Sequence, residues 1–288
     1  MQTRQDSTNH TLSVVSSAHE TFSPPELPPA AQNTLQSMSQ NSTNAIATST
    51  GVPSFSHIVY TDGACKNNNS SADDTTTVRK AGSGIVVFDR LAHEALHCVH
   101  RDYVEHGSSA SLPRWRTALL TRQSPFSTVV CRHIPLRAPP PPPNKISNNR
   151  AELDALVSAL AHFVALAPAT CATPQLYIDI RVDSKYVITT YNNARQWRAN
   201  GWKLASGTVA CNVDQAEEML LYCDALRDAG HTVTLTHVPA HTDVKDVPRD
   251  FDGWCRWFGN DMADRLTNIA AGVETDINYK VAAKKRKR

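Results

Sequence analysis

The sequence has little net charge, no closely paired cysteines and no long apolar run. Lysine and arginine number 29 against 27 aspartates and glutamates, so no overall electrostatic field draws the chain to nucleic acid. Any such binding must use a local basic patch. The seven cysteines contain no Cys-x-x-Cys pair and follow no secretory signal. This favours free thiols in a reducing compartment over a disulfide framework or a zinc site.

Two further absences concern membranes and organelles. The most apolar stretch, residues 155–167, contains His162 and is too short to cross a bilayer, so we expect no membrane contact. Residues 1–54 lack hydrophobic periodicity and are dominated by small polar residues, alanine and proline, which predicts disorder. A mitochondrial presequence would be rich in arginine and poor in acids, and this segment has one arginine, Arg4, against three acids.

The second half of the chain carries the clearest pattern. From Arg150 to Leu166 an apolar stripe at helical spacing predicts a helix. Residues 176–183 alternate between apolar and polar side chains, which is typical of a half-buried strand. We expect the later elements to be a helix from Ser184, a helix over 213–228 ending at Gly230, and a strand over 231–238. Strands followed by helices predict an α/β layer fold.

The first half is less regular. Residues 58–61 predict a strand, after which Asp62 adds a carboxylate and Gly63 is expected to turn the chain away. Residues 81–88 predict a second strand, and a third is expected near 94–101 as its antiparallel neighbour. Residues 102–144 are irregular and end in five prolines, so we expect an inserted surface loop there.

Four acids stand where such elements begin or end. Asp62 and Asp183 end strands, and Glu152 and Asp264 are expected to begin helices. In an α/β sheet these places face a crevice at the carboxyl ends of the strands. Carboxylates that meet at one point repel one another unless cations lie between them. Ligands that are all oxygen favour Mg²⁺ or Mn²⁺ over zinc.

Each acid also has a purely structural interpretation. Asn149-x-x-Glu152 fits a helix capping box, and Asp183 with Ser184 could cap the following helix. Asp261 and Asp264 both suit the first turn of a helix, with Asp261 at its cap. Taken singly, these interpretations are favoured. Taken together, they would require four coincidences in one order, so we favour a catalytic set.

The order of these motifs resembles the type 1 ribonuclease H family. The motifs are Tyr60-Thr61-Asp62-Gly63, residues 148–153, residues 182–187 and residues 259–266. The resemblance covers about 55–272, with two large insertions, and leaves a tail over 273–288. It implies a five-stranded mixed sheet with helices on both faces. It also implies an endonuclease that hydrolyses the RNA strand of RNA–DNA hybrids with two Mg²⁺ ions about 4 Å apart. Asp62, Glu152, Asp183 and Asp264 match the metal ligands.

The resemblance implies further site residues. His241 matches a histidine on a mobile loop that aids proton movement or product release, although Ala240 precedes it where the family has glycine. The following loop, Asp243 to Phe258, is longer than the family leads us to expect. Three asparagines match residues that contact 2′-hydroxyls: Asn68, Asn148 and Asn149. Asn148 also fits a helix N-cap, and a loop histidine is commonly just solvated.

The DNA strand has two expected contacts. Trp197, between Arg195 and Arg198, resembles a basic protrusion that binds this strand; the alternative is a core tryptophan with solvated charges, which we favour for Trp202. Three residues match the positions of a DNA-phosphate pocket: Lys145, Ser147 and Asn212.

The last five residues, Lys284 to Arg288, are all basic. They predict a nuclear localisation signal or a nucleic-acid anchor, and we favour nuclear import. We expect a monomer whose partner is an RNA–DNA hybrid. The alternative function is a non-catalytic protein that binds hybrids on the same fold. The intact set of four acids argues against it, because a binding module does not need them.

Overall fold

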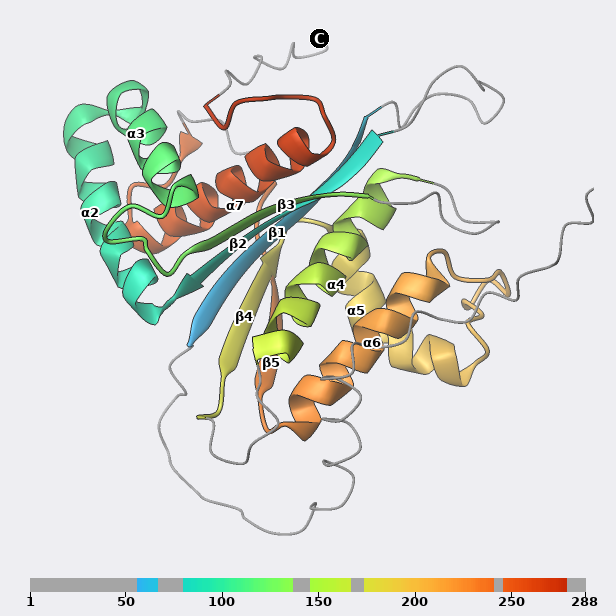
Figure 1. Ribbon diagram of the computed structural model, residues 1–288. Helices are drawn as coiled ribbons and strands as arrows, with labels where there is room; N and C mark the ends of the chain where they lie inside the picture. Colours follow the sequence, from blue (N-terminus) through green and yellow to red (C-terminus); the bar gives the residue numbers. More distant parts are fainter. Residues whose placement is uncertain (1–55, 67–79, 137–145, 167–173, 241–245, 279–288) are drawn as a thin grey trace, which may run out of the picture.

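The computed structural model describes residues 56–66, 80–136, 146–166, 174–240 and 246–278, and in them a mixed sheet lies between two layers of helices (Figure 1). The strands are β1 (His57–Lys66), β2 (Lys80–Asp89), β3 (Val130–Pro135), β4 (Tyr177–Val182) and β5 (Thr232–His237). The helices are α2 (Arg90–His106), α3 (Ser108–Leu120), α4 (Asn148–Leu166), α5 (Lys185–Ala199), α6 (Val213–Asp228) and α7 (Phe251–Ala270). Among the described helices, none is long and apolar enough to span a membrane.

The sheet has five strands in the order β3-β2-β1-β4-β5. The first three strands along the chain pair antiparallel, β1 with β2 and β2 with β3. Strand β1 also pairs in parallel with β4, and β4 with β5. The predicted five-stranded mixed sheet is therefore confirmed, and β1, which carries Asp62, lies at its centre.

Helices cover both faces of this sheet, as expected. Helices α4, α5 and α6 pack on one face, where Leu160, Ile180 and Met219 are buried together. Helices α7, α2 and α3 form the layer on the other face, around Phe88 and Trp254. The two layers stand on opposite sides of the sheet in Figure 1. In each layer one helix, α4 or α7, makes the most extensive contact with β1.

The third strand expected near 94–101 is wrong, because this stretch belongs to helix α2. Ala92, Leu96 and Val99 are buried at spacings of four and three residues, the spacing of one helical face. Asp89 caps the helix by accepting a hydrogen bond from the main-chain nitrogen of Ala92 at 2.7 Å. The antiparallel neighbour of β2 is instead β3, over Val130–Pro135.

The irregular surface loop expected over 102–144 is wrong for most of its length. Its described part holds the end of α2, all of α3 and strand β3, and residues 137–144 lie outside the described residues. Helix α3 has Pro113 inside it, no acidic residue in its first turn and no side-chain cap at Gly107, so the usual sequence signals of a helix are weak. Leu112 and Leu119 are nevertheless buried against the core.

The last helix begins eight residues earlier than expected, at Phe251 instead of Gly259. Asp250 is its N-cap and accepts from the main-chain nitrogen of Gly253 at 2.7 Å. Half of the loop expected over Asp243 to Phe258 is thus helical. Its aromatic residues do pack down, as expected, because Trp254 and Phe258 stack on each other in the core.

The other predictions fit closely. Helix α6 spans the predicted residues 213–228, and Gly230 follows with φ 81°, the left-handed conformation that terminates helices. Strand β4 alternates between buried and half-buried residues, and β5 lies within the predicted 231–238. The N-terminal segment 1–54 and the basic residues Lys284 to Arg288 lie outside the described residues.

Candidate active site

Two of the four acids come directly after a pair of facing residues in the adjacent parallel strands β1 and β4. Thr61 of β1 pairs with Val182 of β4, so Asp62 and Asp183 are the next residues along two adjacent chains. Asp62 is 8% exposed, and Asp183 is half-buried just after the end of β4. This register places both carboxylates at the carboxyl end of β4, as the sequence predicts.

The other two acids come from helices that approach the sheet unusually closely. Gly63 does not turn the chain away, as we expected; it continues β1 and pairs with Ser83. A Cβ atom at Gly63 would lie 2.0 Å from the main-chain nitrogen of Glu152, so only glycine lets α4 reach β1 here.

Helix α7 makes the matching approach on the opposite face. Gly84 pairs with Asp62, and a Cβ atom at Gly84 would lie 2.2 Å from the main-chain oxygen of Ala263. Ala263 directly precedes Asp264 on α7. Two bare glycines therefore let two helices bring Glu152 and Asp264 to Asp62 from opposite sides of the sheet.

Electrostatics confirm that the four acids share one region. Burial raises the pKa of Asp62 well above its ordinary value, and the charges of Asp183, Asp264 and Glu152 raise it further. The main-chain N–H of Gly63 opposes this rise by hydrogen bonding. Burial also raises the pKa of Glu152 to about 7, a hydrogen bond from Ser184 lowers it, and the charge of Asp183 raises it.

Neighbouring polar side chains hold three of these carboxylates. Ser184 donates its hydroxyl to Glu152. Asn260 donates from Nδ2 to Asp183 at 3.3 Å, and Asn268 donates from Nδ2 to Oδ1 of Asp264 at 3.2 Å. These three donors orient the acids before any ligand binds.

The sequence predicted no role for Asn260 or Asn268, and for Ser184 it suggested only a helix cap. The clue to Asn268 is its spacing, because it follows Asp264 by one helical turn. Asn260 has no comparable local clue, because its partner Asp183 is 77 residues away in the chain. Thr267 fixes the backbone instead and donates to the main-chain oxygen of Asp62 at 2.6 Å.

The structural interpretations of the acids hold in one case. Ser184 does cap α5, because its Oγ accepts from the main-chain nitrogen of Val187 at 3.3 Å. At the start of α4, Ser147 accepts from the nitrogen of Arg150 at 3.3 Å, so the alternative of a capping box formed by Asn149 and Glu152 does not hold.

Neither acid of α7 begins the helix. Asp264 lies well inside α7, and Asp261 is not its cap but accepts hydrogen bonds from Arg116 and Arg265. The site therefore takes its last acid from the middle of a long helix.

The set of four acids fits a hard divalent cation. Their donor atoms are all carboxylate oxygens, which Mg²⁺ and Mn²⁺ prefer. Within the described residues, no group of three or more His, Cys, Asp or Glu side chains could hold a metal ion as they stand. Burial is the main cause of the raised pKa values of Asp62 and Glu152, and the charges of neighbouring carboxylates add a repulsion that a cation between them would relieve.

The residues expected to meet the RNA strand lie beside the acids. Asn148 and Asn149 are exposed in the first turn of α4. The side-chain oxygen of Asn148 accepts from the main-chain nitrogen of Cys65 at 2.7 Å, which ties this amide to the end of β1. Two other expected site residues, Asn68 and His241, lie outside the described residues.

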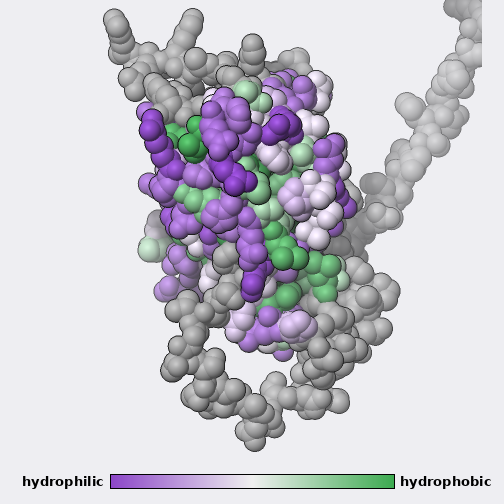
Figure 2. All heavy atoms as spheres, turned by 90° about the vertical axis from the view of Figure 1, so that its left-hand side faces the viewer, coloured by the Kyte–Doolittle hydropathy of each residue, from purple (hydrophilic) through white to green (hydrophobic). Residues whose placement is uncertain are grey.

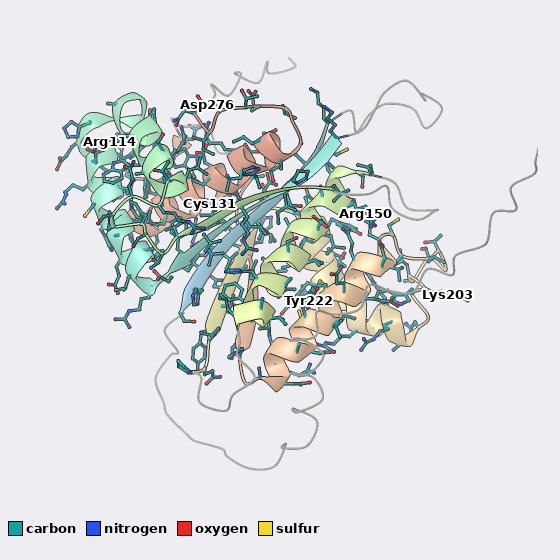
Figure 3. The ribbon with its side chains drawn as sticks, viewed as in Figure 1. Arg114, Cys131, Arg150, Lys203, Tyr222 and Asp276 are labelled. Atoms are coloured by element: carbon teal, nitrogen blue, oxygen red, sulfur yellow. The ribbon has the colours of Figure 1, made fainter. Side chains whose placement is uncertain are left out.

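The expected phosphate pocket is described in part. Arg150 connects Ser147 and Asn212, since its main-chain nitrogen donates to Ser147 and its Nη1 lies 3.4 Å from Oδ1 of Asn212. Arg150 itself pairs with Asp214 at 2.5 Å (Figure 3). Ser147 and Asn212 therefore both contact Arg150, at opposite ends of that residue, while Lys145 lies outside the described residues.

The tryptophan-rich segment divides into two parts. Trp197 is half-buried near the end of α5, between Arg198, which is exposed, and Arg195, which pairs with Asp224. Trp202 packs against the core, as we favoured. The exposed Lys203 lies at the outer end of this layer in Figure 3, beyond α5 and α6.

Comparison with known proteins agrees with this geometry. The family model for RNase H matches residues 127–272, which is half of the chain. Ribonuclease HI of Streptomyces coelicolor is 33% identical over 143 residues, 49% of this chain and 50% of the relative. Ribonuclease H of Ruthia magnifica is 33% identical over 125 residues, 43% of this chain and 68% of the relative.

Among solved structures, a type 1 ribonuclease H with the type 2 active-site motif is 18% identical, with a TM-score of 0.44. That likeness covers 78% of this chain and 75% of the other. At this score it adds nothing to the family match and the curated relatives.

Fold and site together define a nuclease-like α/β domain with a carboxylate centre. The chain belongs to the ribonuclease H family. It spans about half the length of the Streptomyces relative. Strand β1, with Asp62, precedes the matched residues, so the place of Asp62 in the site rests on the strand register and the shared electrostatics.

The repulsion in the site predicts how stability depends on pH without metal. Glu152 binds its proton more tightly in the folded than in the unfolded chain, with a pKa raised from 4.5 to about 7, so the fold loses stability as pH rises through this window. The pKa of Asp62 is also raised, which adds to the loss at higher pH. In chelator, Tm should therefore fall between pH 6 and pH 8, and Mg²⁺ should restore it at pH 8.

Asp62→Asn should raise Tm at pH 8 in chelator by roughly 3–6 °C, since about 1 kcal/mol moves Tm by about 2–4 °C in domains of this size. The substitution should also reduce the increase in Tm that Mg²⁺ produces at pH 8. Glu105→Gln, which removes an exposed carboxylate of α2, is the control and should change neither value. Thermal melts at both pH values measure this, and a variant less stable than wild type in chelator would contradict the repulsion.

Proposed function

We propose that this protein is an endonuclease that hydrolyses the RNA strand of RNA–DNA hybrids. The observation that carries the proposal is the gathering of four acids around Asp62 in a member of the ribonuclease H family. A protein that only binds hybrids gains nothing from burying Asp62 among like charges. The repulsion costs stability, and a catalytic metal site explains why it is kept.

The four acids would hold two Mg²⁺ ions, or Mn²⁺. Bound there, such ions would supply positive charge for the attacking water and the leaving oxygen. The chain's own contribution is to fix the ligands. Ser184 holds Glu152, Asn260 holds Asp183, and Thr267 fixes the backbone of Asp62. A site whose groups are fixed in advance has little reorganisation to undergo during the reaction.

Selection of the RNA strand would come from the edge of the same site. Asn148 accepts a hydrogen bond from the main chain of Cys65, three residues after Asp62 on β1. An amide held at this point can recognise a 2′-hydroxyl on the strand that is cut, which DNA lacks. Asn149 and Asn68 would extend this contact along the same strand.

The DNA strand would lie across the layer of α4, α5 and α6. Ser147 and Asn212 would take a phosphate, with Lys145, and Trp197 would lie against the strand between basic residues. With a net charge of only +2, these local contacts must supply most of the affinity, so binding should weaken steeply with salt. His241 would assist proton movement or product release.

A direct assay tests the reaction. Labelled hybrid, double-stranded RNA and double-stranded DNA are each incubated with the protein in Mg²⁺ and in chelator. Only the hybrid should be cut, only in its RNA strand, and only with metal. Asp62→Asn should abolish cutting and leave hybrid binding largely intact, because it removes a ligand charge and keeps the shape of the side chain.

The control for this assay is again Glu105→Gln, which should cut like wild type. Turnover by Asp62→Asn within tenfold of wild type would overturn the metal-site assignment. Metal-dependent binding without cutting by the wild-type protein would instead favour a non-catalytic hybrid-binding protein.

Trp197 tests the DNA-strand contact. Trp197→Ala should raise KM for the hybrid more than it lowers kcat, because it removes binding shared by the ground and transition states. Its Tm should change little, since the side chain is only half-buried. Trp254→Ala is the matched comparison, because Trp254 is 0% exposed and its loss should cost about 3–5 kcal/mol of unfolding free energy. An unchanged KM with a collapsed Tm would show that Trp197 is a core residue.

The basic tail bears on where the protein is located in the cell. We propose that Lys284 to Arg288 direct the protein into the nucleus, because five consecutive basic residues at a chain end resemble an import signal. A fluorescent fusion without these residues should leave the nucleus. Full nuclear accumulation of the shortened protein would favour a nucleic-acid anchor.

A further inference from the structure

The helices between β2 and β3 reach α7 through a buried arginine. Arg116 lies in α3, and 7% of its side chain is exposed. Its Nε donates to Oδ2 of Asp261 at 3.0 Å, and its Nη2 lies 2.7 Å from the same oxygen. Because two nitrogens of the planar Arg116 guanidinium contact the Asp261 carboxylate, the pair fixes the orientation of the two side chains as well as their separation.

Asp261 is also the meeting point of three segments. Arg265, one turn further along α7, donates from Nε to Asp261 at 2.9 Å and from Nη1 to the main-chain oxygen of Ile277 at 3.0 Å. Asn278 follows and donates from Nδ2 to Oγ1 of Thr117, back on α3, at 3.1 Å. Hydrogen bonds thus join α3, α7 and the segment after α7 in a closed circuit.

This circuit lies next to the acid that α7 contributes to the site. Asp264 follows Asp261 by three residues, and residues three apart lie on one face of an α-helix. Any contact that fixes the rotation of α7 at Asp261 therefore also fixes the direction of Asp264. Arg265, which belongs to the circuit, directly follows Asp264 in the chain.

The apolar contacts of the inserted helices favour the same role. Leu96 of α2 and Leu119 of α3 are completely buried in one cluster with Trp254 and Phe258 of α7. Figure 2 looks at this side of the molecule and shows many hydrophilic side chains on its outer surface. The inserted helices therefore share their apolar core with α7, and Arg116 adds a directional contact to it.

We propose that Arg116 is a positioning residue for the reaction. Through Asp261 it holds α7 at the rotation that directs Asp264 into the metal-binding set. This inference rests on the proposed function, because it takes Asp264 as a metal ligand. Arg116 acts only through the helix, so its loss should alter metal binding before it alters binding of the hybrid.

Arg116→Met tests the inference, since it removes the guanidinium and keeps an unbranched side chain. Calorimetric titration with Mn²⁺, without substrate, should show an apparent Kd raised roughly 10-fold, the lower end of the range seen when a residue that supports a metal ligand is removed. The Mg²⁺ concentration for half-maximal cutting should rise by a similar factor. KM for the hybrid at saturating metal should stay within about twofold.

Arg114→Met is the matched control. Arg114 lies on the same helix, but it is 64% exposed and pairs with Asp102 inside the insertion (Figure 3). This variant also loses an arginine and an ion pair, but the lost ion pair joins α3 to α2 and does not involve α7. Its Mn²⁺ titration should match that of wild type.

Arg116→Lys covers the case in which the methionine variant does not fold. Lysine keeps the charge and loses the planar fork, so an intermediate rise in Kd is expected. A wild-type Mn²⁺ titration for either folded Arg116 variant, measured well below its Tm, would show a purely structural role and overturn the inference. If the wild-type protein binds Mn²⁺ but cuts no hybrid, the proposed function fails, while the titrations still decide the role of Arg116.

Discussion

Repulsion among four carboxylates is the constraint on which the rest of this structure depends. A sheet that brings Asp62 of β1 beside Asp183, just after the end of the parallel strand β4, already places two like charges together. Adding Glu152 and Asp264 requires two helices to press against the same point from opposite faces, which the bare backbone at Gly63 and Gly84 permits. The acids cannot separate, because main chain on both sides holds them. A cation is then the natural partner of the site.

The sequence predicts elements well where the local pattern and the tertiary packing agree. The alternation in β4 and the boundaries of α6 are visible in the sequence, because burial on one face sets both. Helix α2 has an equally regular apolar face at Ala92, Leu96 and Val99, but four histidines and a cysteine along it obscure the helical pattern. Helix α3 contains Pro113, a residue that usually argues against a helix in the sequence. In both, packing against α7 stabilises a helix that its own sequence signals only weakly.

The residues of the site show the same difference between local and tertiary signals. The four acids could be found from the order of their motifs, since each stands at a recognisable element or motif. Two of their supporting residues could not, because Asn260 reaches Asp183 and Thr267 reaches Asp62 across 77 and 205 positions of the chain. The expected turn at Gly63 shows the same limit. An Asp-Gly pair suggests a turn locally, but here the glycine serves the close approach of α4, a fact of tertiary structure.

Two departures from expectation, the inserted helices and the early start of α7, have one physical cause. The insertion leaves β2 at Asp89, which pairs with His57, and this end of the sheet is opposite to Asp62. The first turns of α7 carry Phe251, Trp254 and Phe258, and α2 and α3 supply the apolar side chains that bury them. Neither part could be buried without the other, since a helix face with several large aromatic residues is not stable in water. The longer α7 and the insertion thus form one unit, and it extends from the far end of the sheet to the turn that carries Asp264.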